Sequence, residues 1–380
     1  METMAGIYLH IPFCARRCTY CDFYSTTQHE KKTAYAEALC KELERRKEYL
    51  HSEPVETIYF GGGTPSQLDE EQLSRVLNTI YKVYAVVPDA EITIECNPDD
   101  LTRDYAAMLR RLPFNRLSMG IQTFDESMLR WLRRRHTASQ AVEAYRTCRE
   151  IGFERISIDL MYGLPQETEA QWANDLQRAV ALRPEHLSAY HLIYEQGTPL
   201  WKLRERCRAE EIPEELSVRL FEMLLDRLGE AGYEHYEISN FCLPGYESRH
   251  NLGYWTGEHY LGCGAAAHSF DGISRQWNVA SIDAYIKGTE EGELNFEREA
   301  LDLCTRYNDY VVTALRTRWG MDLKRLRETF GEALYRYCLE MAEPHIGRQV
   351  LAVTDGALHL TRDGLFVSDG IMSDLLWMKV

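Results

Sequence analysis

Three cysteines stand close together in the segment Cys14-Ala15-Arg16-Arg17-Cys18-Thr19-Tyr20-Cys21, directly after the apolar run Ile7–Ile11. Clustered thiolates select zinc, copper or an iron–sulfur cluster. Zinc takes four protein ligands, or three and a water, whereas a cubane cluster held by three cysteines leaves one iron open to an outside molecule. A loop of Arg, Thr and Tyr is a poor place to bury three unrelated thiols. The spacing therefore predicts a metal or cluster site.

Polar residues and a glycine run follow several apolar segments further along the chain. Gly61-Gly62-Gly63-Thr64-Pro65 comes after Ile58-Tyr59-Phe60, and without side chains such a turn lets a ligand approach the backbone. Glu95, Gln122 and Asp159 each stand at the end of an otherwise apolar segment. In parallel barrels the chemistry gathers where strands end. The pattern predicts one binding site for ribose and other polar groups, although a single polar strand end is more often merely solvated.

The elements that must position these residues alternate regularly between strand and helix. Amphipathic stripes separate the apolar runs, and Asp69 with Gln72 resembles a capping box. Such alternation implies parallel strands joined by right-handed crossovers. Six units predict an α/β fold, a partial (β/α)6 barrel. The expected strands are Ile7–Ile11, Thr57–Phe60, Ile92–Cys96, Arg116–Ile121, Arg155–Leu160 and His186–Ile193. The expected helices include Tyr105–Leu112, Glu126–Arg134, Ala138–Ile151, Glu169–Leu182 and Glu214–Ala231.

The pattern changes after Gly232. We expect a barrel domain over 1–232 and a segment over 233–297 that is rich in Tyr, Trp, His, Asn and Gly and forms a shaped surface rather than a core element. Residues 298–380 read as helices followed by a hairpin around Asp355-Gly356 and a closing helix. This predicts a small C-terminal α+β domain that is winged-helix-like.

Composition narrows the class of protein. A chain of 380 residues with 45% hydrophobic and 27% charged residues is typical of a globular protein with a sizeable core. A formal net charge of −16 disfavours nucleic acid as a partner. We find no signal peptide and no apolar run of about 20 residues, as a membrane span would need. Eleven cysteines without those features indicate thiols and metal ligation in the cytoplasm rather than disulfides.

The cysteine segment and several longer motifs resemble a known family of proteins. The Cys-x₃-Cys-x₂-Cys segment with Tyr20 before the last Cys resembles the radical S-adenosylmethionine (SAM) enzymes. The chain further resembles the family of oxygen-independent coproporphyrinogen III oxidase and its relatives, and within it the heme chaperone branch, HemW. The motifs that carry the resemblance are Ile11-Pro12-Phe13-Cys14, Tyr20-Cys21-Asp22-Phe23, Phe60–Pro65, Gly120-Ile121-Gln122-Thr123-Phe124, Asp159–Pro165 and His250-Asn251-Leu252-Gly253-Tyr254-Trp255.

This resemblance implies cofactors and residues. Cys14, Cys18 and Cys21 would ligate a 4Fe–4S cluster, whose open iron is chelated by SAM. The family positions that line SAM sites match Tyr8, Tyr20, Gly62, Gly63, Thr64, Glu95, Gln122, Arg134 and Asp159. Arg134 lies in a run of arginines, on a helix that we expect to follow Gln122. Since a charge run is usually a solvated face, its assignment depends mainly on the resemblance.

The branch motif implies a heme site. Imidazole is a common axial ligand of heme iron, and flat aromatics pack against a porphyrin. His250 is the expected ligand, with Asn251, Tyr254 and Trp255 beside it, and His259 and His268 are nearby competitors. On the residues alone, His250 is equally well a buried structural histidine.

Three functions remain open from the sequence. The resemblance favours a chaperone that binds heme and transfers it to apo-hemoproteins, because the decarboxylating oxidase has a fourth cysteine where this chain has Phe23. The alternative is a radical enzyme such as the oxidase itself, and the third is a zinc-stabilised barrel. The first two also imply an electron donor as a partner. The expected partners therefore are heme, apo-hemoproteins and that donor, with transient membrane association or a homodimer as further options.

Overall fold

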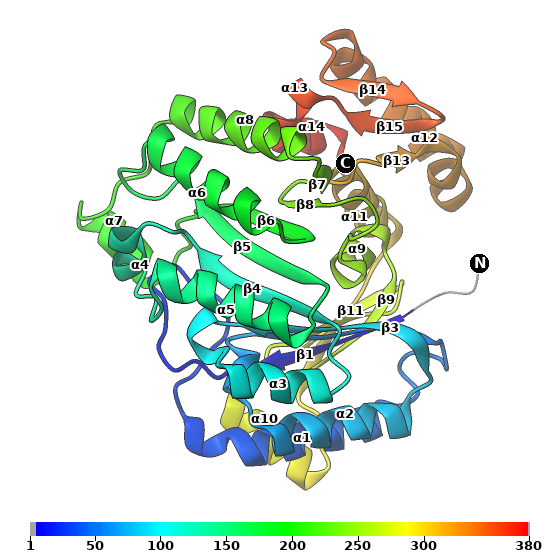
Figure 1. Cartoon of the computed structure of the whole chain (residues 1–380). Helices are drawn as coiled ribbons and strands as arrows, with labels where there is room; N and C mark the ends of the chain where they lie inside the picture. Colours follow the sequence, from blue (N-terminus) through cyan, green and yellow to red (C-terminus); the bar gives the residue numbers. More distant parts are fainter. Residues whose placement is uncertain (1–4, 379–380) are drawn as a thin grey trace.

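Six parallel strands lie side by side in chain order in the middle of one curved, twelve-stranded sheet (Figure 1). The computed structural model describes residues 5–378. The predicted partial parallel barrel is confirmed, and all six expected strands are present. Their bounds are β1 Ala5–Ile11, β2 Val55–Gly62, β3 Val86–Cys96, β4 Arg116–Gln122, β5 Ile156–Tyr162 and β6 His186–His191.

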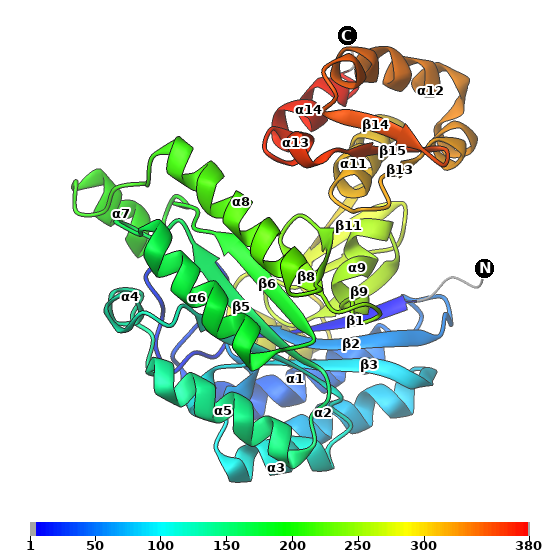
Figure 2. The ribbon, with the colours of Figure 1, turned by 45° about the horizontal axis from the view of Figure 1, so that its top comes forward.

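Helices cover the outer face of these strands (Figures 1 and 2). The helices are α1 Lys32–Arg45, α2 Glu70–Val83, α3 Arg103–Arg111, α4 Glu126–Trp131, α5 Ala138–Ile151, α6 Glu169–Leu182, α7 Pro199–Glu205 and α8 Glu214–Glu230. Side-chain caps set the starts of α2 to α7, but not those of α1 and α8. At the start of α2, Asp69 accepts from the Gln72 backbone N–H at 2.9 Å, and the Asp69 backbone N–H donates to Gln72 Oε1 at 3.2 Å, as the sequence predicts.

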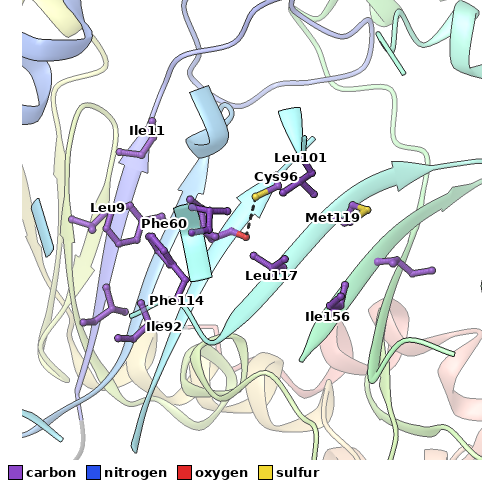
Figure 3. Close-up of a cluster of buried hydrophobic side chains, with 14 of the residues drawn as sticks. Leu9, Ile11, Phe60, Ile92, Cys96, Leu101, Phe114, Leu117, Met119 and Ile156 are labelled. Atoms are coloured by element: carbon purple, nitrogen blue, oxygen red, sulfur yellow. Dashed lines mark hydrogen bonds between the residues drawn. The ribbon is translucent and has the colours of Figure 1, made fainter. Parts of the chain in front are cut away.

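Side chains of the barrel strands alternate between two environments, since successive residues of a strand point to opposite faces. The outward-facing residues are apolar and fully buried against the helices, as Phe60 of β2 and Leu117 of β4 show in Figure 3. The inward-facing residues are mostly polar. Each strand therefore fixes a core residue and a cavity residue in turn. Those on the inner face include Thr93 and Glu95 of β3, Arg116, Ser118 and Gln122 of β4, Ser157 and Asp159 of β5, and His186 and Ser188 of β6.

The segment after Gly232 extends the sheet, so the expectation of a mere shaped surface is wrong. Strand β9 pairs in parallel with β1, and a short hairpin pairs with β6 on the other side. These strands are only three to five residues long, too short to show an alternating pattern in the sequence. The elements are β7 Glu234–Glu237, β8 Asn240–Cys242, α9 Arg249–Thr256, β9 His259–Cys263, β10 His268–Phe270, β11 Ser274–Asn278, α10 Ile282–Glu291 and β12 Phe296–Ala300.

A second hydrophobic core, separate from that of the barrel, lies in the last part of the chain. The predicted hairpin is present, with Asp355 and Gly356 both at positive φ (53° and 80°) in its turn. Gly331, at φ 84°, breaks the long helix α12 near its start. The sequence predicts separate helices over Leu323–Phe330 and Leu334–Ala342, and the break at Gly331 divides α12 between them. The elements are α11 Leu303–Leu315, β13 Met321–Asp322, α12 Leu323–Gly347, β14 Leu351–Thr354, β15 Ala357–Leu360, α13 Arg362–Leu365 and α14 Ser368–Leu375.

Two local predictions are wrong. Arg134 does not lie on a helix: α4 ends at Trp131, and Arg133 takes a left-handed backbone (φ 62°) that turns the chain. Asp159 does not end its strand but lies in the middle of β5.

In the range 5–378 no helix is both long and apolar enough to span a bilayer. All eleven cysteines lie in this range, and each is free of a disulfide.

Candidate functional site

A cavity of about 1070 Å³ occupies the inside of the partial barrel. The three cysteines of the loop after β1 line it together with the inner face of β3 to β6. Backbone hydrogen bonds fix this loop: Thr19 N–H donates to the Leu132 carbonyl at 3.3 Å, and Leu200 N–H donates to the Thr19 carbonyl at 2.9 Å. The loop is thus held against the ends of α4 and α7, over the carboxyl ends of the strands.

Polar groups contact two of the three thiols. Thr64 Oγ1 donates to Cys14 Sγ at 3.5 Å, and Arg134 Nη1 donates to Cys18 Sγ at 3.6 Å. Burial raises the pKa of Cys14, and raises that of Cys21 to about 12. Without iron these two groups are therefore neutral thiols at pH 7, and ligation would release their protons.

The thiols share a cavity but do not converge on one point. Nowhere in residues 5–378 do three His, Cys, Asp or Glu side chains come close enough to hold one metal ion. A zinc site needs its ligands gathered in a compact tetrahedron, with Zn–S bonds of about 2.3 Å. A cubane cluster has several irons, so its cysteine ligands are spread more widely. Three thiols and two donors around an open cavity fit such a cluster.

Glu95 is held at the end of β3 by two donors. Tyr59 Oη donates to its Oε1 at 2.8 Å, and the Gly62 backbone N–H donates to its Oε2 at 3.1 Å. Burial raises the pKa of Glu95 to about 7, and the neighbouring Asp159 adds to the shift while the two hydrogen bonds oppose it. Near neutral pH this carboxyl group is thus either an acceptor or a donor toward a ligand. It also fixes the glycine turn beside it.

Arg134 ties two strands to the cysteine loop. Its Nη2 donates to Asn97 Oδ1 and to the Gly120 carbonyl, each at 2.5 Å, while its Nε has no partner within residues 5–378. Gln122 follows at a bulge of β4 with φ 72°, which aims its side chain differently from a regular strand residue. Both side chains line the cavity.

Asp159 faces the middle of the cavity from β5. Ser118 Oγ donates to both of its carboxylate oxygens at 3.2 Å. Burial raises the pKa of Asp159 to about 6, while hydrogen bonds from Ser188 and Ser118 and the charges of Arg134 and Arg116 act in the opposite direction. Asp159 is therefore an anion above pH 6 and an acceptor for hydroxyl or ammonium groups.

Most of the predicted SAM-site residues are brought together, with one difference. Tyr20, Gly62, Gly63 and Thr64 line the cavity. Tyr8 does not; it lies beneath the lining, where its Oη is 3.2 Å from His10 Nδ1 and its ring stacks on Tyr59 at 6.2 Å between centroids. Tyr8 supports the ring of Tyr59, which does line the cavity.

The predicted heme motif lies on helix α9, whose side chains point in different directions. Asn251 lines the cavity, whereas His250, Tyr254 and Trp255 do not. His250 is 4% exposed, with Nδ1 bonded to Thr57 Oγ1 at 2.7 Å and Nε2 to Tyr254 Oη at 2.9 Å. Burial lowers the pKa of His250 to about 3, so the ring is neutral. Both ring nitrogens are engaged, and neither is free for iron in this arrangement.

The remaining predicted heme residues lie away from the cavity. Trp255 packs under Arg316, whose guanidinium carbon lies 5.5 Å from the ring centroid. Of the competing histidines, His259 pairs with Glu53 at 3.0 Å, and His268 is exposed beside Trp277. The structure thus gives no ready heme ligand among them.

Sequence reasoning missed three groups of the cavity. Asn97 follows Cys96 and accepts from Arg134; its place after a strand end is a signal of the kind that singled out Glu95. Arg116 and His186 begin β4 and β6 and face inward. The alternation of polar and apolar residues along each strand was the signal for them. It marks two faces of the strand, but only the curved sheet shows which face lines the cavity.

Comparison with known proteins gives the family. The model of the radical SAM superfamily matches residues 8–179, and that of the HemN C-terminal domain matches residues 301–367. Heme chaperone HemW of Bacillus subtilis is 33% identical over 98% of this chain and 99% of its own length. Heme chaperone HemW of Mycobacterium tuberculosis is 34% identical, over 98% of this chain and 94% of its own.

The solved structure of Coproporphyrinogen III oxidase (HemN) from Escherichia coli shares the fold. It superposes with a TM-score of 0.85 at 24% identity, over 99% of this chain and 90% of that one. The radical SAM fold brings with it a 4Fe–4S cluster and SAM, and the three thiols in the cavity are the groups that would hold the cluster. By its full-length relatives, the chain belongs to the HemW family within the radical SAM superfamily.

Proposed function

We propose that this protein is a heme chaperone built on a radical SAM barrel. It would bind heme and pass it intact to apo-hemoproteins, with a 4Fe–4S cluster on Cys14, Cys18 and Cys21. The proposal depends most on full-length similarity to proteins named heme chaperone HemW. The alternative, an oxygen-independent coproporphyrinogen III oxidase, has only a shared fold in its favour.

The cavity supports the cluster and SAM part of the proposal. A bound cluster supplies an electron to SAM. Around it Arg134 sets a positive charge against the Cys18 thiolate, and Thr64 donates to Cys14. Glu95, Gln122 and Asp159 point into the same cavity, where a nucleoside's hydroxyl groups and a methionine's ammonium group would find acceptors.

Several apolar side chains along the cavity support a flat apolar ligand. Phe23 is 60% exposed, Ile193 64% and Val367 51%, and all three line the cavity. Large exposed apolar side chains within a concave surface are characteristic of ligand sites. Phe23 also occupies the position at which the decarboxylating oxidase is expected to have a cysteine. A porphyrin face packs on such residues without any protein ligand to its iron.

The role of His250 needs an added step. To bind heme iron, His250 must give up its hydrogen bond to Tyr254 or to Thr57. We infer that Nε2 becomes free when the Tyr254 bond opens. A Tyr254→Phe variant removes the competing hydroxyl and keeps the ring, so it would raise heme affinity if His250 is the ligand.

Reconstitution under anaerobic conditions with iron and sulfide, followed by heme titration, tests the proposal. We expect an absorbance band near 400 nm from the cluster and near-stoichiometric heme binding, without decarboxylation of coproporphyrinogen in the presence of SAM and reductant. Stoichiometric decarboxylation would establish the oxidase instead. Heme binding that is unchanged in both His250→Ala and Tyr254→Phe would remove His250 as the ligand and leave the chaperone proposal standing.

The surroundings of the protein are part of the proposal. Free cysteines and exposed thiols such as Cys207 fit the reducing cytoplasm. An electron donor would have to reach the cluster, and the net charge of −16 favours a donor protein with a basic surface. The same charge disfavours nucleic acid as a partner. A homodimer and a transient membrane contact are further proposals, which gel filtration and vesicle flotation would test.

A further inference from the structure

One end of the cavity holds a guanidinium group with an unpaired nitrogen. Arg116 begins β4, so it lies at the amino ends of the strands, away from the cysteine loop. It lines the cavity, is 2% exposed, and its Nη2 has no hydrogen-bond partner within residues 5–378. A buried donor left unpaired is costly, and a charged one more so. The arrangement therefore calls for an acceptor that the protein itself does not provide.

The partners of Arg116 leave part of its charge uncompensated. Nη1 donates to the Tyr246 carbonyl at 3.3 Å, and Glu91 Oε2 lies 3.6 Å away, beyond a good hydrogen bond. Glu91 is 1% exposed, and its other oxygen accepts the His250 backbone N–H at 3.2 Å. Glu91 thus holds Arg116 in place through its charge, but it does not occupy Nη2.

Further polar groups surround this end of the cavity. Asn251 lines it from α9, and its side chain makes no hydrogen bond to the described part of the chain. Arg316 also lines the cavity, and its Nε is a second unpaired guanidinium nitrogen in residues 5–378. Arg316 packs on Trp255, one helical turn beyond Asn251, which places it on the same face of α9. Among residues 5–378 its ion-pair partner is Asp369, which is 3.8 Å away and 90% exposed.

The remaining neighbours do not fill these donors. The charge of Arg116 acts on Asp159 and that of Arg316 acts on Glu237, in each case opposing the burial that raises the pKa of the carboxyl group. Within residues 5–378, however, no hydrogen bond joins either pair.

His186 bonds Ser157 Oγ at 2.7 Å and Tyr236 Oη at 2.8 Å. Burial holds the pKa of His186 well below its usual range, so it adds no charge. The unfilled capacity here belongs to two guanidinium groups and one amide. Such donors match a carboxylate, which accepts from an arginine fork through two oxygens.

We propose that Arg116, Arg316 and Asn251 form a carboxylate-binding subsite at the amino-end side of the barrel cavity, which takes a propionate group of the bound tetrapyrrole. The inference rests on the proposed function, because it assumes that a tetrapyrrole enters the cavity. The apolar body of the ligand packs on the apolar lining, and its carboxylate reaches the arginines. Heme orientation is then set by this end of the cavity rather than by a histidine.

The test compares heme with heme dimethyl ester, in which both propionates are esterified. Each is titrated into the reconstituted full chain, and the ratio of the two dissociation constants is measured. We expect the wild-type protein to bind the free acid about 10- to 100-fold more tightly, as expected for a charged hydrogen bond. In Arg116→Gln combined with Glu91→Gln, the ratio falls to within about threefold of unity. The paired variant removes both charges, so no lone buried ion remains to unfold the protein.

Two further variants sharpen the result. Glu91→Gln alone keeps the bond to His250 but leaves buried Arg116 without its counter-charge, so the free energy of unfolding of the free protein falls. In the folded fraction, which the thermal midpoint defines, the preference for the free acid rises because the competing anion is gone. Arg103→Gln, which removes an exposed arginine on α3, leaves the ratio at the wild-type value. If the wild-type protein binds heme without preferring the acid, or if the paired variant keeps the preference, the subsite is wrong and the proposed function stands. If the wild-type protein binds no heme, both fail.

Discussion

The carboxyl group of Glu95 carries a pH dependence that can be measured on the protein without cofactors. Folding raises its pKa from an ordinary 4.5 to about 7, chiefly by burial. Between these pH values the folded protein holds the proton more tightly than the unfolded chain, so the free energy of unfolding falls as pH rises through this window. The shift corresponds to roughly 1 to 3 kcal/mol at this partly buried position. In Glu95→Gln this loss is absent, and the thermal midpoint should fall less than in the wild type between pH 5 and pH 8.

A carboxyl group on the surface provides the control. Glu44 is 51% exposed and pairs with Lys82. Glu44→Gln removes the same charge from a solvated position, so its pH profile should run parallel to that of the wild type. If the profile of Glu95→Gln also ran parallel to that of the wild type, folding would not raise the pKa of Glu95.

Single residues differ in how far the sequence alone could place them. The three cysteines could be predicted from their spacing, because a loop of neighbouring residues brings its own side chains together. Glu95 and Gln122 could be predicted from the ends of their strands. Arg116 and Asn251 could not, since their meeting depends on strand register and on helix α9. For His250, the motif predicts a site residue, but its hydrogen bonds to Thr57 and Tyr254 could not be predicted, because they depend on how α9 packs on β2.

At the scale of elements, one buried arginine attaches the added strands to the barrel helices. Arg46, just after α1, donates to the Gly262 carbonyl at 3.1 Å, to Ser269 Oγ at 3.2 Å and to Gln276 Oε1 at 2.9 Å. Its ionic partner is Glu42, at 3.2 Å. Arg46→Met removes the counter-charge of buried Glu42, which keeps only its neutral donors Gly264, Asn278 and Tyr285, and should cost about 3 to 5 kcal/mol. Urea unfolding measures this cost, and hydrogen exchange should rise first in β9 to β11.

Arg75 on α2 is the matched control for Arg46. It pairs with two carboxylates, Glu37 and Glu71, where Arg46 pairs with one, but its side chain is 40% exposed. Arg75→Met should change the free energy of unfolding by less than about 1 kcal/mol. Equal costs for the two variants would show that the Arg46 network does not hold β9 to β11.

The elements that the sequence predicts well are those with a pattern of their own. Helices α5 and α6 have the predicted bounds because each starts at a threonine capping box, Thr137 with Gln140 and Thr168 with Gln171. The strands β7 to β11 could not be predicted, because three to five residues with Gly, His and Ser carry no period. The edges of β1 and β6 offer partners to β9 and β8, and β7, β10 and β11 add to these in turn.

At the scale of the whole molecule, polar and aromatic contacts join the two cores. The Arg318 backbone N–H donates to the Tyr236 carbonyl at 3.0 Å, and the Arg318 side chain pairs with Glu247 at 3.2 Å. Phe221 of α8 packs on Phe366 with ring centroids 5.4 Å apart, and Arg275 pairs with Asp309 at 2.6 Å.

Because the larger core draws on residues up to Ile286, a chain ending at residue 300 should still fold and take up the cluster. It should bind heme more weakly, since Phe366 and Val367 line the cavity.

Gel filtration, absorbance near 400 nm and heme titration would measure these three properties on the shortened chain. An aggregated product would mean that the two cores depend on each other for folding. The sequence shows both units but not their docking, which long-range contacts such as Phe221 with Phe366 decide.

The position of β1 in the sheet has a consequence for the order in which the protein is made. β1 lies between β2 and β9, and Ala5 pairs with both Val55 and His259. While the ribosome works through the intervening residues, one edge of β1 stays open, and with it a row of unpaired amides beside the cysteine loop. The cysteine loop is thus translated long before the wall next to it, which is completed only after residue 263, and this order favours cluster insertion after rather than during translation.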